Sequence, residues 1–194
     1  MINNHSLFEL RISGLDNAAE ISQQWATHTV SILDTDLARM TLATATFYEN
    51  LIPKPRDGLS LCRCYFDDVT PEDNFGLIRF ELILATLADI QAILDFSVNL
   101  TIHDKLLVHC SAGISRSTAV ATGILCQHGL SPKTALNQVF SVRQCAIPNP
   151  YIIALMDEAL ELNGKLTSAL QKYQPDIAGE QNDLKMVGLT QLNS

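Results

Sequence analysis

Side chains with reactive chemistry gather in one stretch near the middle of the chain. The segment KLLVHCSAGISRSTAVATGILCQHG holds Cys110 and Arg116 with five residues between them. Lys105–Val108 is a short apolar run suited to a buried strand. Ser117–Gln127 has the apolar content of a packed helix, and Gly129 is placed to close it. We therefore expect a strand, a short loop that carries the cysteine and the arginine, and a helix.

A loop that curls just before a helix forms a natural site for an oxyanion. Its consecutive backbone N–H groups turn inward, and the helix N-terminus favours negative charge. Gly113 permits the backbone torsions that a tight curl needs. Arg116 adds a planar fork of donors that grips two oxygens at once. The ligand that this arrangement predicts is a phosphate dianion, with Cys110 at the bottom of the bowl.

The donors that would hold phosphate would also stabilise a sulfur anion. We expect Cys110 to be ionised and to attack the phosphorus of a bound ester in line, which gives a phospho-cysteine intermediate. Ser117 is placed to donate a hydrogen bond to the sulfur when it leaves. His109 is expected to help fix the loop. The alternative is a buried core thiol, which would not require the flanking glycine, arginine and serine.

The segment His109–Ser117, HCSAGISRS, resembles the signature of the cysteine-based protein tyrosine phosphatases. The resemblance favours the compact, dual-specificity-like branch, because the substrate loop of the longer tyrosine-specific domains is missing. It implies an α/β fold with a central, mostly parallel sheet flanked by helices. The residues expected to bind the substrate phosphate are Ser111, Ala112, Gly113, Ile114, Ser115 and Arg116.

A proton donor for the leaving group is predicted at Asp67 or Asp68. These residues follow an apolar strand, and a carboxyl group at the carboxyl end of a strand can face the phosphate site. Phe66-Asp67-Asp68 resembles the Phe-Asp-Asp of the regenerating-liver phosphatases, which favours Asp68. Asp68 precedes Cys110 by 42 positions, and we expect a long helix over Phe75–Phe96 to absorb that length. The alternative is that both aspartates merely cap this helix.

The segments before the loop predict alternating strands and helices. We expect strands over Leu7–Ile12 and His28–Leu33, with a helix between them that Asp16 caps. A further helix is expected over Asp36–Asn50. Leu59–Phe66 is predicted as a central strand.

The segments after the loop predict two helices. Ser131-Pro132 begins a helix that runs over Lys133–Val142, and Asn149-Pro150 begins a last one over Tyr151–Leu162. By resemblance, Arg143 and Asn149 support the loop and take no part in the chemistry.

Length and composition limit the number of domains and the classes of function that the chain can have. The 194 residues suit one domain, expected over 1–174, with a polar tail over 175–194. A net charge of −8 gives little material for a nucleic-acid-binding face. No apolar run is long enough to span a bilayer, and the N-terminus lacks the pattern of a secretory signal, so we expect a cytoplasmic protein. The spacing of the five cysteines predicts neither a disulfide framework nor a metal site, and no cofactor is implied.

Cys62 and Cys64 lie on one face of their predicted strand, since side chains alternate. Packing in the core is the favoured interpretation. The alternative is a redox switch in which one of them traps an oxidised Cys110.

Three functions remain open at this stage. The first is a phosphatase that removes phosphate from phosphotyrosine in a protein or peptide substrate, and the sequence leaves open whether phosphoserine and phosphothreonine are substrates too. The second is a phosphoinositide phosphatase, which the absence of lysine from the loop disfavours. The third is a phosphoprotein-binding module that has lost its acid. The sequence does not predict the oligomeric state.

Overall fold

The computed structural model describes residues 7–35, 48–74 and 82–173. Four strands form one fully parallel sheet in the order β1-β4-β2-β3. They are β1 (Glu9–Ser13), β2 (His28–Leu33), β3 (Ser60–Tyr65) and β4 (Lys105–His109). Parallel strands need crossover connections, and helices supply most of them. The predicted α/β fold with a parallel sheet is confirmed.

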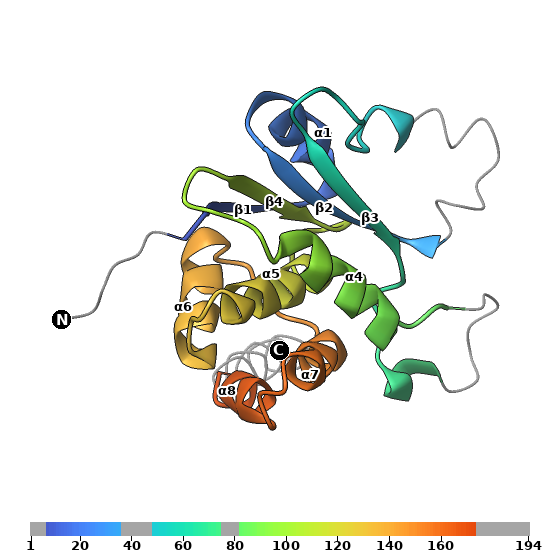
Figure 1. Ribbon diagram of the computed structural model, residues 1–194. Coiled ribbons are helices and arrows are strands. Elements are labelled where there is room, and N and C mark those ends of the chain that lie inside the picture. The colour runs from blue at the N-terminus through green and yellow to red at the C-terminus, as the bar shows by residue number, and fades with distance from the viewer. Residues whose placement is uncertain (1–6, 36–47, 75–81, 174–194) are drawn as a thin grey trace, which may run out of the picture.

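Helices cover both faces of this sheet (Figure 1). Helix α1 lies on one face, and α4 to α8 form a layer on the other. A 3₁₀ turn, η1, covers Pro71–Asn74. The helices are α1 (Leu15–Gln24), α4 (Leu87–Ser97), α5 (Arg116–Gln127), α6 (Pro132–Val142), α7 (Pro150–Ala159) and α8 (Lys165–Gln171).

The main core lies between the sheet and α5. Each residue from Arg116 to Cys126 is buried, so α5 is enclosed on all sides. Gly123 lets α7 approach closely, because a Cβ there would lie 2.3 Å from the Sδ of Met156. The central strands β2 and β4 are also almost wholly buried, as expected of parallel strands covered on both faces. The strand and the helix that flank the predicted phosphate loop are thus held rigidly.

Two predictions about the strand and helix near Asp68 are wrong. The segment over Leu59–Phe66 does form a strand, but β3 lies at the edge of the sheet instead of its centre. The helix predicted over Phe75–Phe96 begins at Leu87, because Thr86 and Asp89 form a capping box there. Residues 75–81 lie outside the described residues.

Two helix boundaries also differ from prediction. Helix α1 has Gly14 at its N-cap, and Asp16 lies in the first turn without capping it. Helix α7 begins after Asn149 as predicted, but it is not the last, since α8 follows. The prediction missed α8 because Leu162-Asn163-Gly164 breaks the helical pattern. The helix expected over Asp36–Asn50 and the tail over 175–194 fall largely or wholly outside the described residues.

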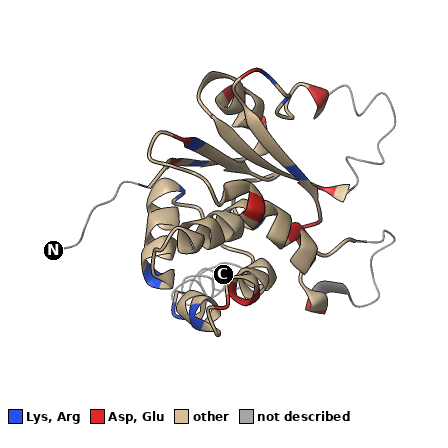
Figure 2. Cartoon of the chain, viewed as in Figure 1, with Lys and Arg blue, Asp and Glu red and all other residues tan. Residues whose placement is uncertain are grey.

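Charged residues are spread over both layers of the fold, and no helix or strand in Figure 2 collects a row of basic residues. Among the described residues, no helix is long and apolar enough to cross a membrane.

Candidate active site

The loop between β4 and α5 holds Cys110 at the carboxyl end of the central strand. The side chain of Cys110 is 1% exposed. Its Sγ accepts a hydrogen bond from the backbone N–H of Gly113 at 3.2 Å, and the Oγ of Ser117 lies 3.3 Å away. The sulfur therefore lies inside the curl of the loop, against Gly113 and Ser117.

The carbonyl groups of this loop are held from outside. Donors from α1, from Arg143 and from the segment before α7 bind four consecutive carbonyl oxygens, which turns the intervening N–H groups toward the sulfur. Among the described residues, Gly113 is the one member of 111–115 whose N–H has an assigned acceptor, and that acceptor is Sγ. The bonds are Leu15 N to Ser111 O (3.0 Å), Arg143 Nη2 to Ala112 O (3.1 Å), Arg143 Nε to Gly113 O (2.9 Å) and Ile147 N to Ile114 O (2.9 Å).

Gly113 is required by the packing of the loop against β1. Its φ of +69° lies in the left-handed region. A Cβ at this position would also lie 2.4 Å from the carbonyl carbon of Ser13. The end of β1 and the loop thus touch backbone to backbone, which fixes the curl.

Arg116 is oriented by three partners and keeps one donor free. The side chain is 2% exposed. Its Nη1 donates to the carbonyl of Phe66 at 2.8 Å, and its Nη2 lies 2.6 Å from Oδ1 of Asp34 and 3.2 Å from Oγ of Ser111. The Nε is buried and has no hydrogen-bond partner among the described residues. A buried N–H without a partner is costly, so this donor marks a place for a ligand acceptor.

The neighbours Asp67 and Asp68 have opposite environments. Asp67 is 8% exposed and accepts hydrogen bonds from the N–H and Oγ1 of Thr35, at 3.0 and 2.6 Å, and from the N–H of Ile83 at 2.9 Å. Burial raises the pKa of Asp67, but the hydrogen bonds from Ile83 and Thr35 and the charge of Arg116 together leave it below the ordinary value. Asp67 is therefore ionised, and its carboxylate joins the end of β3 to the segments that hold Thr35 and Ile83.

Asp68 is exposed, and its carboxyl group lies at the rim of the loop. Oδ1 accepts hydrogen bonds from Oγ of Ser115 at 2.7 Å and from Nδ2 of Asn149 at 2.9 Å. Oδ2 has no assigned partner among the described residues. Neither aspartate caps α4, whose N-cap is Thr86, so the capping alternative is wrong.

Asn149 connects three parts of the site. Its Nδ2 reaches Asp68, its backbone N–H donates to the carbonyl of Ser115 at 3.3 Å, and its Oδ1 accepts from the N–H groups of Tyr151 and Ile152 at the start of α7. One residue thus caps a helix and holds both the loop and the candidate acid.

His109 is buried beneath the loop and pairs with β2. Its Nε2 lies 2.8 Å from Oγ of Ser31, the residue directly opposite in the parallel register. Burial lowers the pKa of His109 to about 4, and the nearby charges of Arg63 and Arg116 act in the same direction. The ring is therefore neutral at pH 7 and links β4 to β2.

Asp34 is the main site residue that the sequence analysis missed. It follows β2, and its two carboxylate oxygens bind Arg116 and the Oγ of Ser111. A single aspartate at a strand end has no characteristic spacing. The available signal was its place after a predicted strand, on the edge where Asp67 and Cys110 also lie.

A cavity of about 550 Å³ opens beside the loop. It is bounded by the ends of β2 and β3, by the start of α1 and by Ser111. Its described lining residues are Leu15, Asp16, Asp34, Tyr48, Leu51, Asp67, Asp68, Val69, Leu82 and Ser111.

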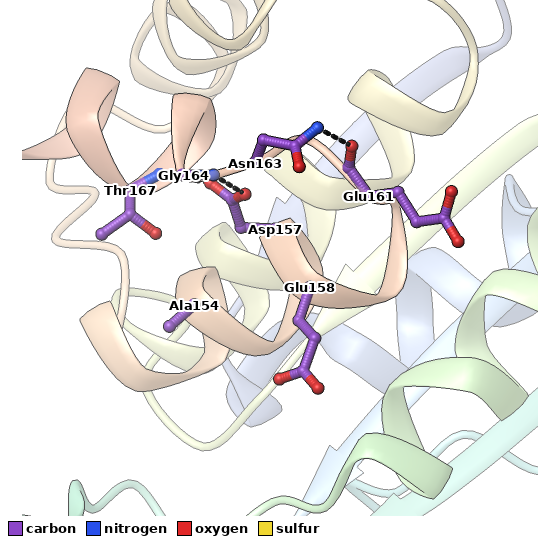
Figure 3. A pocket seen from close by; sticks show the side chains of 7 residues that line it. All are labelled: Ala154, Asp157, Glu158, Glu161, Asn163, Gly164 and Thr167. Atoms are coloured by element: carbon purple, nitrogen blue, oxygen red, sulfur yellow. Dashed lines mark hydrogen bonds between the residues drawn. The ribbon is translucent and has the colours of Figure 1, made fainter.

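A second cavity, of about 540 Å³, lies at the turn between α7 and α8. Figure 3 shows Asp157 pointing to the backbone at the start of α8. Its carboxylate accepts from the N–H groups of Gly164, Leu166 and Thr167 at 2.6 to 2.8 Å. This carboxylate is a helix cap, and the cavity around it has no candidate chemistry.

Cys62 and Cys64 share one face of β3, with their sulfurs 3.9 Å apart. Strand β2 lies between β3 and the strand that leads to Cys110. Two strand spacings separate Cys64 from Cys110 by roughly 10 Å, whereas a disulfide requires Cα atoms within about 7 Å. A direct link to Cys110 would require the backbone to move, which favours the packing interpretation.

Comparison with solved structures identifies the fold. A variant of human DUSP28 is 23% identical with a TM-score of 0.50, and the match covers 80% of this chain and 94% of that chain. The human tyrosine phosphatase-like serine/threonine/tyrosine-interacting protein is 20% identical with a TM-score of 0.50, covering 79% of this chain and 92% of that chain. The chain has the dual-specificity phosphatase fold. No family model matches the sequence, and no curated protein matches it.

The dual-specificity phosphatase fold agrees with the resemblance predicted from His109–Ser117. At these identities the likeness concerns the fold, and the roles of individual residues rest on the geometry described above.

Proposed function

We propose that this protein is a cysteine-dependent phosphomonoester hydrolase that removes phosphate from phosphotyrosine, and also from phosphoserine or phosphothreonine, in proteins or peptides. The observation that carries the proposal is the buried Nε of Arg116, which has no partner among the described residues and follows a loop whose Gly113 N–H donates to the Cys110 sulfur. These donors match a tetrahedral dianion above a nucleophile.

The proposed reaction has two steps. The Cys110 thiolate attacks phosphorus, an S–P bond forms, and the P–O bond to the leaving group breaks while Asp68 supplies its proton from Oδ2. Water, activated by the Asp68 carboxylate, then attacks phosphorus and releases inorganic phosphate and the thiolate. Arg116 and the loop N–H groups hold the equatorial oxygens throughout, and Ser117 donates to the departing sulfur.

The geometry supports Asp68 over Asp67 as the acid. Both carboxylate oxygens of Asp67 accept hydrogen bonds, from three donors in all, and its pKa is lowered. Asp67 is therefore ionised and cannot donate a proton. Asp68 lies at the exposed rim of the loop, and its Oδ2 has no assigned partner in the described part of the chain.

The nucleophile is tested by Cys110→Ser, with Cys145→Ser as the matched control because Cys145 is an exposed thiol whose sulfur has no assigned contact with the loop among the described residues. We expect Cys110→Ser to abolish hydrolysis of p-nitrophenyl phosphate while still binding the phosphate analogue vanadate, and Cys145→Ser to keep the wild-type rate. Normal turnover by Cys110→Ser would refute the mechanism. No turnover by the wild-type protein would favour the phosphoprotein-binding module.

The acid is tested by the leaving group. Asp68→Asn should lower kcat for phenyl phosphate by about 10²- to 10⁴-fold, and by much less for p-nitrophenyl phosphate, whose leaving group needs little protonation. Asp67→Asn should instead lower the unfolding midpoint. Equal losses on both substrates for Asp68→Asn would assign the proton donation to another residue.

A further inference from the structure

The cavity of about 550 Å³ shares a wall with the phosphate site. Asp34 and Ser111 line it, and both bind the guanidinium of Arg116. A phosphoryl group that meets the free Nε of Arg116 and the loop N–H groups therefore places the rest of its substrate against this cavity. The chemistry of the cavity wall then selects the substrate.

Carboxylates dominate the charge of this wall. Four aspartates line the cavity, and no lysine or arginine is among its described lining residues. Three of the four are engaged, since Asp34 pairs with Arg116, Asp67 with Thr35 and Ile83, and Asp68 with Ser115 and Asn149.

Asp16 is the cavity aspartate that has no role in the proposed reaction and no assigned bond to another segment of the described chain. It lies exposed in the first turn of α1, and its one assigned partner among the described residues is the neutral amide of Asn17 at 2.8 Å. A bound phosphate dianion adds two negative charges next to this wall, and the charge of Arg116 is already paired with Asp34. Like charges in a partly enclosed site repel, so a cation brought in by the substrate would be favoured.

Apolar side chains complete the cavity and suit the stem of a long basic residue. Leu15 and Leu51 lie on the side of α1, and Val69 and Leu82 on the side of Asp68. Lysine and arginine lay their methylene groups along such surface while the charged head meets a carboxylate.

We propose that the substrate is a phosphopeptide with arginine or lysine within a few residues of the phosphorylated side chain, and that Asp16 is a specificity-determining residue that binds this cation. The inference rests on the proposed function and narrows its substrate class. A polyanionic substrate such as an inositol phosphate would meet the same wall unfavourably.

The test uses three phosphotyrosine peptides that differ in the residues flanking phosphotyrosine, which are arginine, alanine or glutamate. At low salt we expect kcat/KM to be about tenfold higher for the arginine peptide than for the glutamate peptide, and the ratio to shrink in 0.5 M NaCl. Asp16→Asn should lower kcat/KM for the arginine peptide by roughly two- to fivefold and leave p-nitrophenyl phosphate hydrolysis unchanged.

Glu20→Gln is the matched control, because it removes an exposed carboxylate one turn further along α1 and away from the cavity. It should leave the peptide preference intact. Equal kcat/KM for the three peptides, with p-nitrophenyl phosphate still hydrolysed, would overturn this inference alone, as would equal effects of the two variants. No hydrolysis of p-nitrophenyl phosphate by the wild-type protein would overturn the proposed function itself.

Discussion

The carboxyl edge of the sheet and the turn between α7 and α8 each combine aspartate side chains, backbone N–H groups and a cavity of similar volume. They use these parts differently. At the turn, the three N–H groups at the start of α8 all bind Asp157, so donors and acceptor satisfy each other. At the sheet edge, the aspartates bind side chains and other segments, and the loop N–H groups other than that of Gly113 have no assigned acceptor within the described residues.

The contrast shows that composition alone does not distinguish the candidate active site from the structural turn. What differs is whether a buried hydrogen-bond donor lacks an acceptor within the described protein. At the sheet edge, the Nε of Arg116 has no acceptor among the described residues. At the start of α8, the three N–H groups that face Asp157 all donate to its carboxylate. Changes at the first region should therefore act on catalysis, and changes at the second on stability.

The largest effect is expected from Arg116→Lys. A lysine cannot bridge Phe66 and Asp34 and also present a third donor to phosphate, because it lacks the planar fork. We expect kcat/KM for p-nitrophenyl phosphate to fall by about 10³-fold, roughly 4 kcal/mol, in steady-state assays. A loss below about tenfold would remove the distinction between the two regions.

The next effect concerns the pH dependence of stability. His109 has its pKa lowered to about 4 in the folded protein, against about 6.5 when unfolded. As pH falls from 6.5 to 4, His109 becomes protonated in the unfolded state but stays neutral in the folded state. The contribution of His109 to the free energy of unfolding should therefore drop by about 3 kcal/mol and level off below pH 4.

Urea denaturation at several pH values tests this, with His109→Asn as the comparison. The variant should lack this component of the decline. Curves of the same shape for both proteins would show that His109 is not held neutral, and would weaken the interpretation of the Ser31 contact as a neutral link.

Asp157→Asn is expected to act on stability alone. It weakens three hydrogen bonds to a carboxylate and should lower the free energy of unfolding by about 2 kcal/mol. Glu158→Gln is the matched control, since Glu158 is the exposed neighbour on the same helix, and it should change stability by less than about 0.5 kcal/mol. Loss of kcat in Asp157→Asn protein that is still folded would contradict the assignment of this turn as structural.

The smallest effect is expected from Arg143→Met, which removes the two donors that hold the Ala112 and Gly113 carbonyls from outside. The loop should keep its curl through β1 and α7 but lose some order. We expect kcat/KM to fall by roughly fivefold, about 1 kcal/mol, with vanadate binding weakened in proportion. An unchanged kcat/KM would show that the loop is fixed without outside support.

Local patterns predicted the parts of the site that lie close together in sequence. The spacing of Cys110, Gly113 and Arg116 describes one loop, and its curl follows from short-range geometry that the residues themselves dictate. The strand over His28–Leu33 and the helix start at Ser131-Pro132 were predicted for the same reason. Asp68 was singled out by a resemblance, and its surroundings agree with a rim position.

Contacts between residues that lie far apart in the sequence could not be predicted. Asp34 meets Arg116 because β2 lies next to β4, and strand order is set by the packing of whole elements. The same cause moved β3 to the edge of the sheet. The helix expected over Phe75–Phe96 was predicted too long because its apolar content was taken as helical. Two hydrogen bonds hold Ile83 to the backbone N–H and the carboxylate of Asp67, and the Thr86 cap starts the helix later.

The backbone contact between Gly113 and the end of β1 has a consequence for laboratory evolution. No side chain larger than hydrogen fits there, and none can be accommodated by a rotamer change, because the obstructing atoms are main chain. A saturation library at codon 113, selected for fold or for turnover, should return glycine alone, while codons 112 and 114 on either side tolerate substitution.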